Sequence, residues 1–161
     1  MIADVLNEIK RILETHLPDE LAKQDGHAGD GVVCDPFRSI QFDETQPNNG
    51  FPAIVIRPEE MVPTHWATGV KDVDYTISIG IVTTDTVEEN SLKKLWRSLR
   101  AVENALEAWA TSGGVIMNIK TTGINYQAGL FSVQGGAGVE KAGILQVVAT
   151  ERLRSYSKIQ V

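Results

Sequence analysis

The chain has 161 residues, of which 42% are hydrophobic and 22% charged, a composition typical of one globular domain that can bury its own core. Fifteen Lys and Arg stand against 21 Asp and Glu, and this formal charge of -6 argues against a protein that wraps nucleic acid tightly. A protein past which DNA only slides is compatible with it, because an acidic wall repels the phosphate backbone.

The single cysteine, Cys34, excludes an intramolecular disulfide and a thiolate cluster for zinc. No apolar run approaches the roughly 20 residues of a membrane span, and the first residues read as an amphipathic segment instead of a signal peptide. We therefore expect a cytoplasmic protein without membrane contact.

The first predicted element is a helix over residues 4 to 16, which Pro18 should end because the residue before a proline is pushed out of the α region. Residues 18 to 51 are predicted to be irregular, with turn signals and room for short strands at 32–33 and 39–42. A connection of this length predicts a functional or partner-contacting role for part of it. The helical stripe consists of Val5, Leu6, Ile9, Ile12, Leu13 and Leu17.

Two strands are expected next. Residues 53–57, bracketed by Pro52 and Pro58, form a β-branched run typical of a strand buried on both faces. Residues 59–70 read as a loop, and residues 72–83 alternate apolar and polar side chains, which predicts a strand with one face on a core.

A long helix is predicted over about 87–110, opened by a capping box from Thr86 to Glu89 and ended by Gly113 and Gly114. Residues 115–126 change parity at Gly123, which indicates a bulge in a strand, and a final strand is predicted over about 141–156. The expected fold is one α+β domain over residues 1–161, with a mainly antiparallel sheet in the order α-β-β-α-β-β and both helices on one face.

Candidate chemistry is sparse. His16 is expected at the end of the first helix, and His27 lies in an acidic and glycine-rich turn that lacks the ligands of a calcium loop. Cys34 follows two valines and is typical of a small buried hydrophobe more than of a nucleophile. We therefore expect no enzyme: no catalytic residue, no metal and no cofactor.

Surface residues are the better candidates for function. Interfaces take their anchors from aromatic residues outside the regular stripes, and a glycine-rich hairpin tip can order against a neighbouring subunit. The predicted contact residues are His65 and Trp66 in the 59–70 loop, with Phe131, Gly135, Gly136 and Gly138 around the glycine-rich tip.

The order of elements resembles the tail terminator, or tail completion, proteins of long-tailed bacteriophages over nearly the full chain. The resemblance rests on the N-terminal amphipathic helix, the strand from Phe51 to Ile56, the strand ending at Thr83, the long helix, and the last strand around Leu145 to Thr150. The resemblance is one of element order and of the pattern of apolar and polar residues, and it includes no invariant motif.

The resemblance implies a six-subunit ring that caps the head-proximal end of the tail tube and presents a docking surface to the head connector. DNA would pass through its central hole, and in a contractile tail the outside of the ring would also touch the sheath. Two other interpretations stay open: a head-closure or adaptor protein of the phage neck, and a small ligand-binding α+β domain with an apolar pocket.

Overall fold

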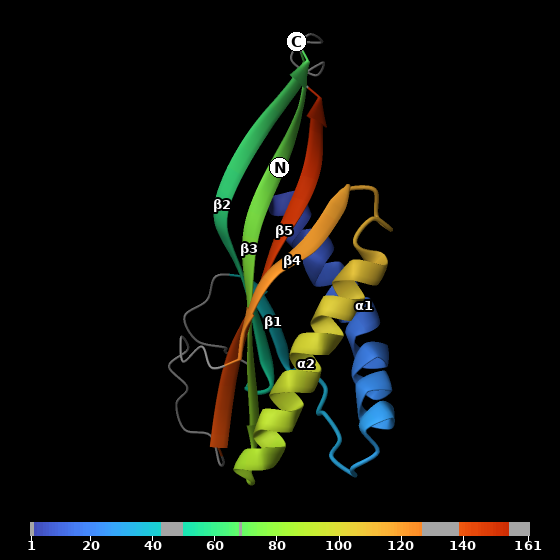
Figure 1. The fold of residues 1–161 in the computed structure, drawn as a ribbon, viewed down its shortest axis with the longest axis vertical. Helices are drawn as coiled ribbons and strands as arrows, with labels where there is room; N and C mark the ends of the chain where they lie inside the picture. The colour runs from blue at the N-terminus through green and yellow to red at the C-terminus, as the bar shows by residue number, and fades with distance from the viewer. Residues whose placement is uncertain (1, 43–49, 68, 127–138, 155–161) are drawn as a thin grey trace.

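The computed structural model describes residues 2–42, 50–67, 69–126 and 139–154 and folds them into two helices and one five-stranded sheet. Both helices lie on the same face of the sheet (Figure 1), which confirms the predicted α+β class. The elements follow in the order α1 (Ile2–Ala28), β1 (Ser39–Phe42), β2 (Ala53–Ala67), β3 (Val70–Asp85), α2 (Glu88–Trp109), β4 (Asn118–Asn125) and β5 (Val139–Arg154).

The sheet has the strand order β1-β2-β3-β5-β4, so β3 and β5 are interior strands and β1 and β4 are its edges. All neighbouring pairs are antiparallel except β1 and β2, which run parallel. The alternation predicted for the central strand is confirmed, because every second residue of β3 from Val73 to Ile81 is buried. These residues meet Leu95, Leu99, Val102 and Leu106 of α2, Val5, Ile9, Ile12 and Leu13 of α1, and Leu145 and Val147 of β5 in one core.

The predicted end of the first helix is wrong, because α1 passes through Pro18 and continues to Ala28. A proline inside a helix removes one backbone hydrogen bond and costs about 3 kcal/mol. Leu17 and Leu21, on either side of Pro18, are both buried in the core, and their burial offsets that cost. The helix ends where Gly29 adopts a φ of 60° and its N–H donates to the Asp25 carbonyl, so the irregular region is shorter than expected.

The loop predicted over residues 59–70 is also wrong. The strand that begins at Ala53 continues through Pro58 and Pro63 to Ala67 and pairs with β3 from Ala53 to Ala67, with register shifts at Glu59 and Trp66. Only its first residues, Ala53 to Ile56, also pair with β1. Beyond Ile56 the strand has a neighbour on one side within the described residues, and an edge strand accommodates prolines because one row of its N–H groups is not used in the sheet.

The capping box predicted from Thr86 to Glu89 does not form at the start of α2. Val87 is the N-cap residue and makes no side-chain cap, while the carboxylate of Asp85 accepts a hydrogen bond from the Val87 N–H at 2.9 Å. Lys94 donates to the same carboxylate and holds the pKa of Asp85 below its usual range. The bulge predicted near Gly123 is confirmed by a register shift between Thr121 and Gly123.

Candidate assembly surfaces

The contact residues predicted from the sequence fall largely outside what the structure describes. His65 and Trp66 belong to the end of β2, where His65 pairs with Lys71 of β3, but their side chains are outside the described part. Phe131, Gly135, Gly136 and Gly138 all lie in the segment 127–138, which is not among the described residues. Their role in contacts therefore stays a prediction.

An exposed strand lies largely within residues 59–70, which were predicted to form a loop. Residues Pro58–Thr64, called the β2 arm below, form a strand in which every residue is exposed. Alternate residues of a strand point to opposite faces, so this part of β2 is open to solvent on both faces as well as along its outer edge. In Figure 1 the strands β2, β3 and β5 continue together past the ends of both helices.

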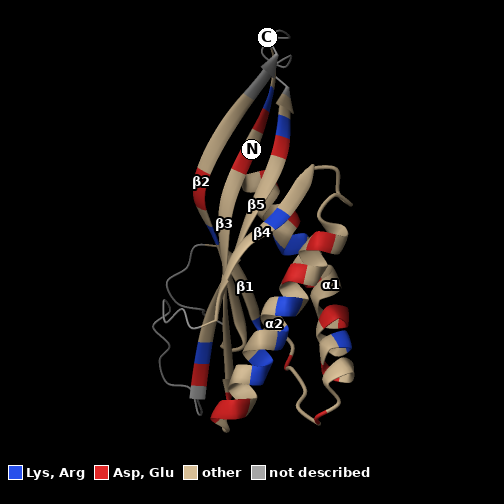
Figure 2. Ribbon diagram, viewed as in Figure 1, with Lys and Arg blue, Asp and Glu red and all other residues tan. Residues whose placement is uncertain are grey.

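The β2 arm combines apolar and acidic side chains. Met61 and Val62 are 56% and 47% exposed, which is unusual for two consecutive large hydrophobic residues in a strand. Glu59 and Glu60 have no ion-pair partner within the described residues, and they form the acidic segment of β2 in Figure 2. The nearest sequence signal would have been this Glu-Glu-Met-Val run between two prolines.

A second surface is an open groove of about 480 Å³ between α1 and the segment that leads into β1, called the α1–β1 groove below. Its lining combines apolar and polar side chains in similar measure. Lys10, whose Nζ lies 5.3 Å from the centre of the Phe42 ring, and Arg38 are the cations in its lining, and Glu14 is the carboxylate. Neither cation has a carboxylate partner among the residues that the structure describes. The remaining lining residues are Leu13, Leu17, Pro18, Leu21, Pro36, Phe37, Ser39, Ile40 and Gln41.

The connection between α1 and β1 is held against α2 by charged side chains. Arg97 of α2 binds the carboxylates of Asp25 and Asp30 and donates at 2.7 Å to the Val32 carbonyl oxygen. One turn earlier on the helix, Lys94 lies 3.1 Å from a carboxylate oxygen of Asp35. The acidic residues around His27, which suggested a turn in the sequence, therefore act as partners of a helix arginine.

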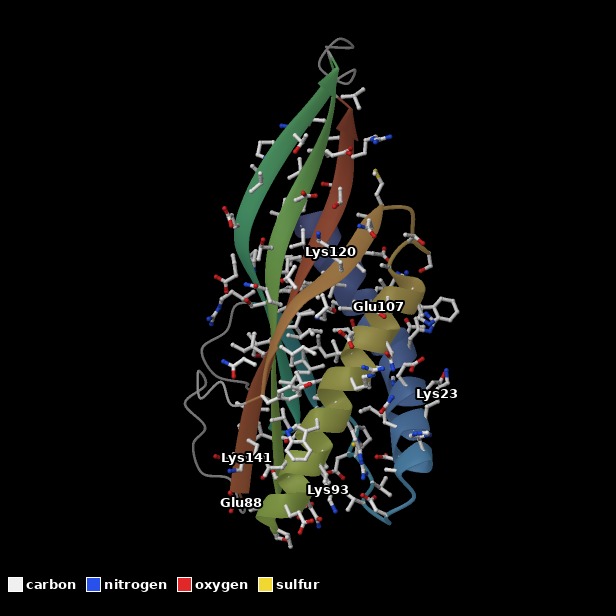
Figure 3. All side chains as sticks on the ribbon, in the orientation of Figure 1. Lys23, Glu88, Lys93, Glu107, Lys120 and Lys141 are labelled. Atoms are coloured by element: carbon white, nitrogen blue, oxygen red, sulfur yellow. The ribbon has the colours of Figure 1, made fainter. Side chains whose placement is uncertain are left out.

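A further ion pair joins the start of α2 to the start of β5. Lys141 of β5 and Glu88 of α2 lie side by side (Figure 3), with the Nζ atom 2.8 Å from a carboxylate oxygen. This hydrogen bond holds the pKa of Glu88 below its usual range. The pair links the start of α2 to β5 at the surface, while the buried core residues of α2 hold the helix on the sheet.

The side chains of His16 and Cys34, which the sequence offered as candidates for chemistry, pack against other residues of the fold. His16 was predicted to end the first helix, but it lies within α1. Its ring stacks on that of Trp109, with the ring centroids 4.0 Å apart. Within the part of the chain that the structure describes, no three His, Cys, Asp or Glu side chains gather closely enough to hold a metal ion. The Cys34 thiol is half-buried and packs against the core. Its burial, with the Asp25 carboxylate beside it, raises the pKa of Cys34 to about 12.

We expect Cys34 to react slowly with iodoacetamide in the folded protein. At pH 8 a thiol with a pKa of about 12 is ionised about a thousandfold less than one with the ordinary value of 9, and the thiolate is the nucleophile. The alkylation rate at pH 8, followed by mass spectrometry, should therefore be at least about a hundredfold lower than the rate in urea. Equal rates in the folded and unfolded protein would contradict the burial of this thiol.

No known protein-family model matches this chain, and no curated protein matches its sequence. Among the described residues, neither helix is both long enough and apolar enough to cross a bilayer. The candidate surfaces therefore rest on the chain's own residues: an exposed strand that carries acidic and apolar side chains, and a groove that carries apolar and basic ones.

Proposed function

We propose that this chain is a tail terminator of a long-tailed bacteriophage: a non-catalytic structural protein that closes into a ring of six copies at the head-proximal end of the tail tube. The observation that carries the proposal is the β2 arm. A strand exposed on both faces and along one edge tends to associate with other chains unless a partner covers it. The order of elements, which resembles that family, supplies the kind of assembly.

In this proposal the chain binds copies of itself, the tail tube protein on one face and the head connector on the other. In a contractile tail it also touches the sheath. The protein acts in the tail and neck of the virion and assembles in the host cytoplasm. DNA passes through the lumen of the ring, and the net charge of -6 favours passage over retention because like charges repel.

A head-closure or adaptor protein of the neck is the second candidate, since the same exposed strand would serve contacts with portal-side proteins. The two candidates differ in the partner that the protein binds. A tail terminator binds the tail tube protein and stops its polymerisation, whereas an adaptor leaves the length of the tube unchanged.

The test is the native mass of the purified protein, alone and mixed with tail tube protein of the same phage. We expect a ring of about six chains, formed alone or on the end of the tube, and tubes that stop growing when the protein is added. A chain that stays monomeric at all concentrations and leaves tube growth unchanged would refute the terminator function.

A further inference from the structure

We propose that the β2 arm of one copy docks into the α1–β1 groove of the next copy. This inference rests on the proposed function and names the contact that builds the ring. The arm offers two carboxylates that have no ion-pair partner in the described part of the chain, Glu59 and Glu60, beside the exposed side chains of Met61 and Val62. The groove offers two cations that have no carboxylate partner within the described ranges, Lys10 and Arg38, beside accessible apolar residues such as Pro18, Pro36 and Phe37.

The two surfaces match in charge and in apolar content. Glutamates that approach Lys10 and Arg38 would form ion pairs with these cations, while Met61 and Val62 would cover groove residues that are not already buried, such as Pro18 and Phe37. Burial of apolar side chains gives the contact its stability, and the charge pairs fix its orientation and suppress wrong partners. Glu14, the one carboxylate in the lining, limits where the arm glutamates can lie.

The arm cannot fill the groove of its own chain. Residues Ala53 to Ile56 of β2 pair with β1, and the strand then runs away from the groove. At about 3.4 Å per residue, Met61 lies about 17 Å along the strand from Ile56. The occupant is therefore a second copy. Because the arm and the groove are different surfaces, such a contact is head-to-tail, the kind of contact that forms a ring when the rotation between neighbours closes.

The prolines of the arm favour side-chain docking over strand addition. Pro58 and Pro63 have no N–H group, so an approaching strand could not form an unbroken hydrogen-bond ladder on the outer edge of the arm. The same feature keeps two arms from pairing edge to edge, which would lead to unregulated aggregates. A groove lined by side chains accepts the arm without needing its backbone donors.

The test uses two charge-reversed proteins. Glu59→Lys/Glu60→Lys reverses the arm, and Lys10→Glu/Arg38→Glu reverses the groove. Each protein alone should lose at least about tenfold in the fraction of chains in rings, under conditions where the unmodified protein forms them, because like charges then meet at every contact. An equimolar mixture should restore rings in which the two proteins alternate, since each reversed arm then meets a reversed groove.

Native mass spectrometry of the mixture, with the two proteins of different isotopic mass, reads the composition directly. We expect equal numbers of the two proteins in each ring. A matched control reverses one acid and one base elsewhere, Glu107→Lys on α2 and Lys120→Glu on β4, both exposed (Figure 3), and should leave ring formation unchanged. Far-UV circular dichroism shows whether each protein is folded, and Met61→Asp/Val62→Asp tests the arm without altering the groove.

The possible failures can be told apart. Rings that form normally from each reversed protein overturn the arm-in-groove contact and leave the terminator function intact. Rings that form normally while the groove-reversed protein no longer binds tube protein assign the groove to that partner and also overturn this proposal. An unmodified protein that remains monomeric with and without tube protein overturns both.

Discussion

Replacing Arg97 by alanine should lower the free energy of unfolding by about 3 kcal/mol, because it removes the cation from a buried ion pair and leaves the carboxylate behind. The Arg97 side chain is only 10% exposed, and that of its partner Asp25 is 13% exposed. The variant also loses the hydrogen bond to the Val32 carbonyl, which fixes the connection between α1 and β1. Urea unfolding followed by circular dichroism measures the effect.

Arg100→Ala is the matched control on the same helix. The Arg100 side chain is 65% exposed, and its Nη1 atom lies 3.6 Å from a carboxylate oxygen of Glu103 one turn away, a pair of the kind that contributes less than about 0.5 kcal/mol. Equal losses of stability in the two variants would show that Arg97 does not hold the connection in place.

Leu99→Ala should cost about 3 kcal/mol or more, because it opens a cavity at the centre of the contact between α2 and the sheet. Leu99 is fully buried, and it packs so closely over Gly143 of β5 that a Cβ atom at that glycine would lie 3.0 Å from Leu99 Cδ1. The loss should appear as a lower urea midpoint with an unchanged slope. Glu107→Ala, at an exposed position of the same helix, should change stability by less than about 0.5 kcal/mol, and a similar effect for both would contradict the core assignment.

The parts of the fold that could be predicted from the sequence are those whose pattern is local. The alternation of β3 and the apolar spacing of α2 each depend on residues within one element, and both elements have nearly the predicted bounds. The bulge near Gly123 was visible as a change of parity for the same reason. The α+β class followed from these elements alone.

The two errors in the bounds of α1 and β2 have one physical origin, which is the reliance on proline as a terminator. Pro18 lies inside α1, and Pro58 and Pro63 lie inside β2. In each case a tertiary circumstance overrides the local rule: leucines buried on either side of Pro18, and an edge position for the prolines of β2. Both candidate surfaces include residues from these misread stretches, so neither the β2 arm nor the α1–β1 groove could be recognised before the structure was known.

The parallel pairing of β1 with β2 could not be predicted from the sequence either. Its register joins Ser39 to Ala53 and Phe42 to Ile56, and nothing in four residues of sequence specifies a partner or a direction. The partner of Arg97 was equally hidden, since Asp25 and Asp30 are far from it along the chain. The partner and direction of a short strand and the partners of a buried arginine are determined by the tertiary packing.

The pairing of β3 with β5 has a consequence for the time course of synthesis. Its register joins residues that are distant in sequence, Val70 with Arg154 and Asp85 with Val139. The middle of the sheet therefore cannot close until β5 has left the ribosome, and until then β2 and β3 have no β5 partner on the open side of β3. Pairing between distant segments is slow and prone to aggregation, so the nascent chain should depend on chaperones more than a helical protein of the same size.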